Sequence, residues 1–149
     1  MGRVNVVKEI TFDCAHMLTG HSSLCRNLHG HTYKVQIGIF GEQIVGGSSA
    51  DMVIDFKILK SIINDCIKDK FDHALILSAE EFRGEAENEL YAWAIKYGMR
   101  YYVMPRRTTA EDMAILFQQI ISDELKARDL KSYEVSVRVY ETPTSYAEV

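Results

Sequence analysis

Alternating apolar and polar positions predict several β-strands along this chain. Between Tyr133 and Tyr140 the valines occupy every second position, which is typical of a strand with one buried face. The same alternation runs from His29 to Ile39, and apolar side chains at Val4, Val6, Ile10 and Phe12 share one face of a further strand. Shorter apolar segments predict strands at residues 52–54, antiparallel to the second strand, and 100–104. Residues 13–28 and 41–50 are expected to be loops.

Apolar positions three and four residues apart predict three helices. Asp55 can cap a helix that runs to about Lys70, with the apolar stripe Phe56, Leu59, Ile63, Cys66 and Ile67. After Phe71-Asp72-His73 and the apolar run at 74–77, a second helix is expected over 79–97. It has an acidic first half, the apolar residues Leu90, Trp93, Ala94 and Tyr97, and Gly98 as its stop. The third helix carries Met113, Ala114, Phe117, Ile121 and Leu125 inward, and a capping box pairs Thr108 as N-cap with Glu111.

The order of these elements predicts an α+β sandwich, in which helices pack on one face of an antiparallel sheet. At 149 residues the chain has the length of one domain, spanning 1–149, and it contains neither an internal repeat nor a linker.

Charge and composition exclude several functional classes. Seventeen basic and 21 acidic residues give a net charge of −4, which argues against a nucleic-acid or membrane-surface binder. The apolar stretches are too short to cross a bilayer, and the charged N-terminal segment is unlike a signal peptide. Three cysteines are an odd number, so at least one is free, as suits a reducing compartment. A cytoplasmic protein is expected.

Histidines between positions 16 and 31 are the first candidates for chemistry. His29 and His31 lie two residues apart on a predicted strand, so both side chains leave from one face. His16 follows the preceding strand, which can bring it to the same end of the sheet. Three neutral histidines that leave a fourth position open are typical of catalytic zinc. His21, in the loop, is an alternative third ligand, and unliganded core histidines remain the simpler interpretation of the pair.

Other polar residues near these histidines are candidates for acid–base chemistry or binding. Cys25 lies four residues before His29, so it is either a reactive thiolate, a fourth metal ligand or a small buried residue. Asp72 and His73 offer a carboxylate beside an imidazole. Glu141 ends the last strand and can hold a guanidine-like edge through two parallel hydrogen bonds, or it is an ordinary exposed glutamate. Glu111 is already explained by the capping box.

These segments together resemble the 6-pyruvoyl-tetrahydropterin synthase family. The similarity is carried by Phe12-Asp13-Cys14-Ala15-His16, by the segment from Cys25 to Val35 and by that from Met52 to Lys60, and it continues through Phe71-Asp72-His73, Thr109-Ala110-Glu111 and Tyr140-Glu141-Thr142. It covers most of the chain outside the region between His73 and Thr109. The compact Cys-x3-His-x-His spacing is similar to the bacterial 6-carboxy-5,6,7,8-tetrahydropterin synthases of queuosine biosynthesis, whereas animal pyruvoyl enzymes place the cysteine farther away.

The resemblance implies a tunnelling fold, with homo-oligomers (trimers or hexamers) and active sites between subunits. It implies zinc held by His16, His29 and His31, and catalysis by Cys25 together with an Asp72–His73 relay. It implies a catalytic and pterin-anchoring role for Glu141, with Thr109 and Glu111 near the pterin. Leu24, Ala110 and the extra segment 79–104 depart from many relatives.

The implied reaction is a zinc-dependent lyase reaction on 7,8-dihydroneopterin triphosphate. It yields 6-carboxy-5,6,7,8-tetrahydropterin, acetaldehyde and triphosphate. The alternatives are triphosphate elimination to the pyruvoyl product, another pterin side-chain cleavage, a reaction on a different heterocycle, and a non-catalytic zinc-binding assembly protein. The cations available for the phosphates are Arg26, Lys34, Arg106 and Arg107.

Overall fold

A long antiparallel hairpin forms the centre of the molecule. In the structure, a computed structural model that describes residues 2–130 and 133–149, β1 (Arg3–His16) pairs with β2 (His29–Glu42) along its whole length. On the far side of β2 lie β5 (Glu134–Thr142) and β6 (Ser145–Glu148), both antiparallel to their neighbours. On the far side of β1 lie β3 (Ala74–Leu77) and β4 (Tyr101–Val103), both in parallel pairing. The described sheet therefore has the order β4-β3-β1-β2-β5-β6.

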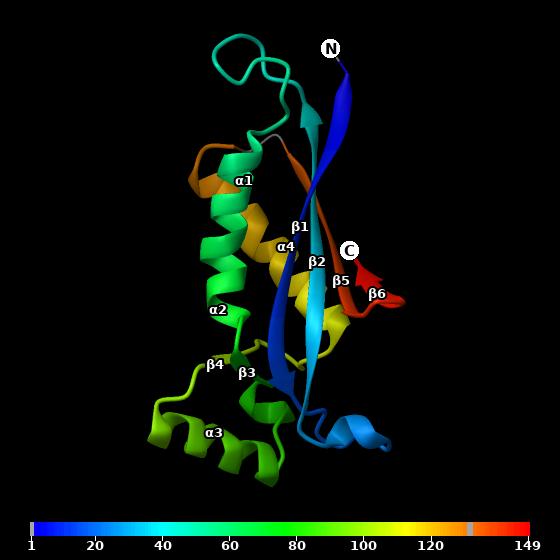
Figure 1. The fold of residues 1–149 in the computed structure, drawn as a ribbon, viewed down its shortest axis with the longest axis vertical. Coiled ribbons are helices and arrows are strands. Elements are labelled where there is room, and N and C mark those ends of the chain that lie inside the picture. Colours follow the sequence, from blue (N-terminus) through cyan, green and yellow to red (C-terminus); the bar gives the residue numbers. More distant parts are fainter. Residues whose placement is uncertain (1, 131–132) are drawn as a thin grey trace.

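The helices pack on one face of this sheet, which confirms the predicted fold class (Figure 1). The first helical segment joins α1 (Phe56–Ile63), the π-helical η2 (Asn64–Lys68) and the short α2 (Asp69–Phe71), and α4 (Ala110–Ala127) lies beside it. Asp55 caps α1 as predicted, because its carboxylate accepts a hydrogen bond from the Lys57 backbone N–H at 2.7 Å. Phe56, in contrast, is largely exposed rather than part of the buried stripe. The sheet is mixed rather than wholly antiparallel, because β3 and β4 join it at its edge after the helical crossover.

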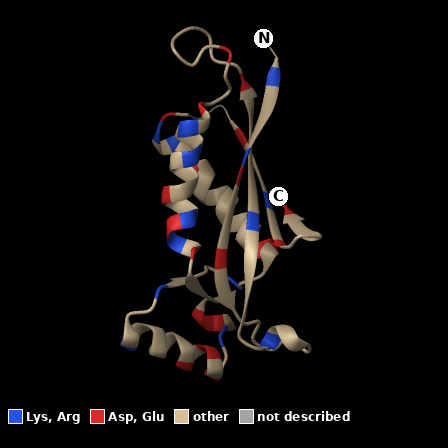
Figure 2. Cartoon of the chain, viewed as in Figure 1, with Lys and Arg blue, Asp and Glu red and all other residues tan. Residues whose placement is uncertain are grey.

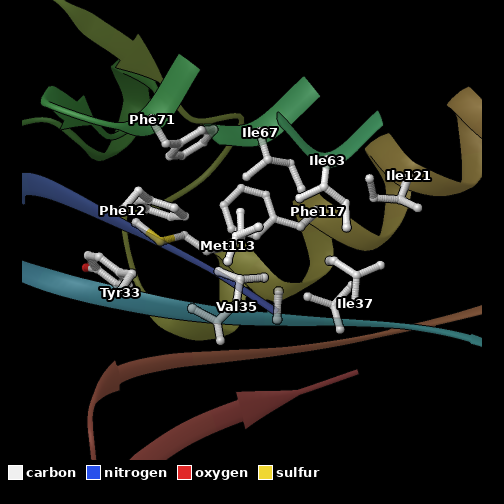
Figure 3. Close-up of a cluster of buried hydrophobic side chains, with 14 of the residues drawn as sticks. Phe12, Tyr33, Val35, Ile37, Ile63, Ile67, Phe71, Met113, Phe117 and Ile121 are labelled. Carbon is white, nitrogen blue, oxygen red and sulfur yellow. The ribbon is translucent and has the colours of Figure 1, made fainter. Parts of the chain in front are cut away.

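The hydrophobic core lies between the sheet and these helices (Figure 3). Phe12 of β1 stacks on Tyr33 of β2 at a centroid distance of 5.5 Å and meets the edge of Phe117 from α4. Phe71 packs against Phe12 and Phe117 and closes this aromatic cluster from α2. Each of these rings is almost fully buried, so their contacts fix β1, β2, α2 and α4 relative to one another.

The first strand extends four residues beyond its predicted end. Cys14 and His16 continue the buried alternation that includes Phe12, and their backbones pair with His31 and His29 of β2. Residues 13–16 are therefore strand and not loop. The alternation does not predict this extension because histidine is not a typical core residue, although His16 is buried here.

The strand expected at residues 52–54 does not form. Val53 and Ile54 are buried, but the segment is a turn whose Met52 carbonyl accepts a hydrogen bond from the Ile44 N–H at 2.8 Å. Three apolar residues supply too few ladder hydrogen bonds to fix a strand, and packing against the core satisfies their burial instead.

The second expected helix starts later than predicted. A 3-10 turn, η3 (Glu80–Phe82), precedes α3 (Glu85–Tyr97), which ends at Gly98 as predicted, with this glycine in a left-handed conformation (φ 65°). Figure 2 shows acidic residues at the start of α3, where they complement the positive end of the helix dipole. Of the predicted apolar side, Ala94 is buried and Leu90 half-buried, but Trp93 and Tyr97 are exposed.

The cap of α4 is one residue from its predicted place. Thr109, not Thr108, is the N-cap, and its hydroxyl accepts a hydrogen bond from the Asp112 N–H at 3.1 Å. Thr108 is fully buried and points to His16 instead. The two threonines are adjacent and chemically identical, so the sequence pattern fits either position, and tertiary contacts decide between them.

Candidate metal centre

The antiparallel register of β1 and β2 brings three histidines together. His16 pairs directly with His29, and His31 lies opposite Cys14, which makes it a diagonal neighbour of His16. All three rings leave from the same face as Phe12 and Tyr33. Their candidate ligand nitrogens lie within 4.8 Å of one another, so this cluster can hold a metal ion. The expectation that an adjacent strand carries His16 to the other two is confirmed.

Hydrogen bonds at the outer nitrogens fix the tautomers of two of these rings. His16 Nδ1 lies 2.9 Å from the backbone carbonyl oxygen of Thr108, and His29 Nδ1 lies 2.7 Å from that of Asn27. A carbonyl oxygen only accepts, so each Nδ1 is the protonated nitrogen and each neutral ring has its lone pair on Nε2. Such outer hydrogen bonds orient metal-binding histidines in proteins.

The inner nitrogens are left without suitable partners. His16 Nε2 and His29 Nε2 face each other at 3.1 Å, which sets two lone pairs against one another. His31 Nε2 is buried and has no hydrogen-bond partner within the described residues. A cation shared by the three nitrogens removes both penalties, so the donor set fits a metal, and three imidazoles suit zinc in particular.

Burial favours the neutral form of two of these histidines, His16 and His31. Desolvation lowers the pKa of His16 to about 4, against the weaker opposing effect of its hydrogen bond to Thr108. Desolvation also lowers the pKa of His31, although the Glu141 carboxylate acts in the opposite direction. Neutral imidazole is the form that binds metals, so at neutral pH His16 and His31 are ready to do so.

Glu141 lies beside this cluster. Its Oε1 is 3.6 Å from His31 Nε2, and both residues line a cavity of about 460 Å³ together with Lys34, Tyr140 and Pro143. The ammonium group of Lys34 lies 4.1 Å from the centre of the Tyr140 ring, so a carboxylate, an aromatic face and a cation meet in one cavity. This arrangement can bind a flat polar heterocycle next to the metal site.

Asp72 and His73 point toward one another in the turn before β3. Asp72 Oδ1 is 3.1 Å from His73 Nδ1, and it also accepts a hydrogen bond from the Asp13 N–H at 3.0 Å. The Asp13 N–H is the main reason why the pKa of Asp72 is lowered. His73 has a left-handed backbone (φ 58°), which its own N–H stabilises by donating to the Asp13 carbonyl at 2.7 Å. The Asp72 carboxylate, favoured in its ionised form, therefore orients the exposed imidazole of His73.

A second cavity is lined by one residue of the histidine cluster and one of this pair. It has a volume of about 580 Å³ and is lined by His31 and His73, by residues of β1 and β2 near them, and by Trp93 and Met99 from segment 79–104. His31 and His73 thus border one cavity within the described chain.

Cys25 lies apart from the ligand set. It occupies the 3-10 turn η1 (Leu24–Arg26), is half-buried, and is not a member of the histidine cluster in the described structure. His21 is exposed, and its Nδ1 accepts a hydrogen bond from the Ser23 N–H at 3.0 Å, so it does not replace His16. Burial raises the pKa of the Cys14 thiol, with Asp13 adding to the effect, which agrees with a role as a small core residue.

The remaining predicted residues lie at the start of α4 or on the surface. The Thr109 side chain caps the helix. Glu111 is exposed and is not part of the capping box in which it was expected. Arg106 pairs with Asp112 at 3.2 Å, and Arg26 and Arg107 are exposed. Of the four candidate cations only Lys34 lines the Glu141 cavity among the described contacts.

Sequence reasoning missed two residues of this region. The Thr108 carbonyl orients His16, and Tyr33 buries a hydroxyl that has no hydrogen-bond partner among the described residues. A backbone acceptor leaves no signal in the sequence. Tyr33 continues the alternation of His29 and His31, which places it next to the cluster on the same face, at a ring distance of 5.4 Å from His31. In the described part of the chain, every helix is too short or too polar to cross a lipid bilayer.

Comparison with known proteins gives a consistent picture. The sequence model of 6-pyruvoyl tetrahydropterin synthase matches residues 5–149. The chain is 41% identical over 143 residues to the 6-carboxy-5,6,7,8-tetrahydropterin synthase of Haemophilus influenzae, covering 96% of each chain. It is 32% identical over 146 residues to the enzyme of the same name from Rickettsia typhi, covering 98% of this chain and 99% of the other.

Solved structures share the fold at lower sequence identity. A catalytic-residue mutant of Plasmodium vivax 6-pyruvoyltetrahydropterin synthase superposes with a TM-score of 0.73 at 22% identity, covering 100% of this chain and 98% of the other. The Caenorhabditis elegans 6-pyruvoyl tetrahydropterin synthase has a TM-score of 0.66 at 20% identity, covering 100% and 96%. With a family match over nearly the whole length and relatives above 30% identity, the chain belongs to the 6-pyruvoyl tetrahydropterin synthase family.

Proposed function

We propose that this protein converts 7,8-dihydroneopterin triphosphate and one water molecule to 6-carboxy-5,6,7,8-tetrahydropterin, with release of acetaldehyde and triphosphate. The observation that carries the proposal is the position of Glu141 beside His31, because a carboxylate that can bind the edge of a heterocycle then lies next to a cluster that can hold a metal. The choice of the carboxy product is supported by the curated relatives named 6-carboxy-5,6,7,8-tetrahydropterin synthase. The proposed enzyme is a lyase of queuosine biosynthesis that acts in the cytoplasm.

His16, His29 and His31 would hold zinc, whose chemistry is to polarise the substrate oxygens and so acidify neighbouring C–H bonds. Glu141 accepts the N–H edge of the pterin through two hydrogen bonds and so fixes the orientation of the side chain. Lys34, in the same cavity, adds a positive charge near an anionic substrate.

Proton transfer is assigned to Cys25 and His73. Cys25, as thiolate, removes one proton from the substrate side chain. His73 transfers a second proton at its Nε2, because Asp72 occupies its Nδ1 and holds the ring in one orientation. Thr109 and Glu111 complete the pterin site from the start of α4, where Glu111 has no capping partner to satisfy.

The test is incubation of the zinc-loaded protein with 7,8-dihydroneopterin triphosphate, followed by mass analysis of the pterin products and measurement of acetaldehyde. We expect the carboxy product with acetaldehyde. The Cys25→Ala variant should keep its zinc and lose turnover by at least about 100-fold, the lower range for loss of a general base. Cys66→Ala, which removes a thiol on η2, is the matched control and should keep the wild-type rate.

Two results would contradict this assignment. A pyruvoyl product without acetaldehyde would instead support the activity named for the family and for its solved structural neighbours. Absence of any product from the zinc-loaded protein would favour a zinc-binding assembly protein on the same scaffold.

A further inference from the structure

A buried carboxylate links the extra segment to the loop that carries Cys25. Glu87 of α3 is fully buried, which is rare for a glutamate and costly unless its oxygens are hydrogen-bonded. One oxygen accepts from the Ser78 backbone N–H at 2.7 Å, and the other accepts from the Thr19 hydroxyl at 2.7 Å. Both carboxylate oxygens thus accept hydrogen bonds. One bond comes from the residue that follows β3, and the other comes from residues 17–28, which we call the cysteine loop.

The cysteine loop and α3 also approach closely beside this hydrogen bond. A Cβ atom at Gly84, the residue before α3, would lie only 2.7 Å from the Thr19 methyl carbon. A side chain at this position would have to displace Thr19, so the glycine permits the close approach beside the Glu87–Thr19 hydrogen bond. Figure 1 shows α3 and the cysteine loop at the same end of the molecule, where β1 ends and β2 begins.

Thr19 is connected to Cys25 by a short path. The N–H of Leu18, the residue before Thr19, donates to the Cys25 carbonyl at 2.9 Å and closes the cysteine loop on itself. At its other end the Asn27 carbonyl accepts from His29 Nδ1 at 2.7 Å. The backbone at Cys25 is therefore held through the residue next to Thr19, and the backbone two residues later is held by a histidine of the candidate metal site.

We propose that Glu87 is a positioning residue for Cys25: through the Thr19 hydroxyl it fixes the cysteine loop so that the thiol is held toward the substrate. The inference deepens the proposed function and rests on Cys25 being the base. It also assigns a role to segment 79–104, which lies within the residues that the family model matches.

The experiment uses the full-length, zinc-loaded protein and the Thr19→Val variant. Valine keeps the size and the methyl group of threonine but removes the hydroxyl, while the Glu87 bond to Ser78 stays intact. We measure the rate at which iodoacetamide alkylates Cys25 across a pH series, with each of the three cysteines resolved by peptide mass analysis, and also zinc content, kcat and KM.

We expect a several-fold change in the Cys25 alkylation rate and a loss of kcat of about tenfold, because small displacements of a catalytic group are costly. Zinc content, KM and the alkylation rates of Cys14 and Cys66 should stay at wild-type values. Thr19→Ser, which restores the hydroxyl, should recover both properties. Gly84→Ala, which displaces Thr19 from the other side, should reproduce the defect.

Glu89→Gln is the matched control, because this glutamate lies on the exposed face of the same helix. Wild-type alkylation and kcat in Thr19→Val would overturn the inference. So would a uniform loss of zinc and stability in all Thr19 variants, which would indicate a purely structural role. If Cys25→Ala keeps full turnover, the assignment of the base fails, while a changed Cys25 alkylation rate in Thr19→Val still supports the positioning of the loop.

Discussion

His16 is the residue at which the candidate metal site and the hydrophobic core meet. Its side chain is 1% exposed, its ring lies 6.2 Å from that of Tyr33, and its Nδ1 proton is committed to the Thr108 carbonyl. A buried neutral histidine lowers the free energy of unfolding in acid, because the unfolded chain binds a proton that the buried ring does not bind.

The metal-free protein should therefore lose stability between pH 6.5 and pH 4. The pKa of His16 in the folded protein is lowered from 6.5 to about 4, so the unfolded state binds more protons in this range. The free energy of unfolding therefore decreases as the pH is lowered. One pKa unit corresponds to about 1.4 kcal/mol, which gives a total loss of roughly 3 kcal/mol from this group.

The measurement is urea unfolding at pH values from 7.5 to 4 after metal removal. Carboxyl groups also titrate in this range. The quantity to compare is therefore the difference in the free energy of unfolding between the wild type and His16→Gln at each pH. Parallel pH curves for the two proteins would contradict a lowered pKa at His16.

At the scale of single elements, the start of α4 shows how one residue pair changes the interpretation of a motif. The cap at Thr109 leaves Thr108 to serve the metal site, and Asp112 takes the position that Glu111 was expected to occupy. One threonine thus stabilises the helix while its neighbour orients a histidine.

Thr109→Ala should destabilise the protein by about 1 kcal/mol, the usual cost of a lost N-cap. Glu111→Gln, which changes a residue outside the cap, should alter the free energy of unfolding by less than about 0.5 kcal/mol. Urea unfolding of both variants at neutral pH checks this, and an equal or larger loss in Glu111→Gln would restore the capping box with Thr108.

At the scale of the whole molecule, we predict an oligomer of three or six copies with active sites between subunits, as the family likeness leads us to expect. In the described chain His31 and His73 line one cavity, which leaves two arrangements to compare: a site completed within one chain, and a site that takes its proton-transfer pair from a neighbouring copy. Light scattering should give three or six times 17.0 kDa, and a mass of one chain would contradict the prediction.

Complementation separates the two arrangements. His31→Ala should lose metal and His73→Ala should lose proton transfer, so each variant alone is inactive. We expect that the two variants, co-expressed with different tags and purified through both, regain part of the wild-type rate, because a shared site can then combine two intact halves. Activity no higher than that of the single variants would place the complete site within one chain.

Much of the fold was predictable because its signals are local. Alternation located β1, β2 and β5, and the spacing of apolar residues together with Asp55 located the first helical segment. The parallel edge strands β3 and β4 were not identifiable as such, because their pairing depends on a crossover that brings distant segments together. β6 was missed for a related reason: its four residues form a strand only against β5.

The sequence by itself determined which residues can carry chemistry: His29 and His31 share a face by the two-residue period of a strand, and Asp72 and His73 are neighbours in a turn. Only the tertiary structure decided how these groups combine. Strand register put His16 opposite His29, the Thr108 and Asn27 carbonyls set the tautomers, and the burial of Glu87 connected the extra segment to the cysteine loop. The physical reason is that periodicity is a property of adjacent residues, whereas hydrogen-bond partners, register and burial depend on segments that are far apart in the chain.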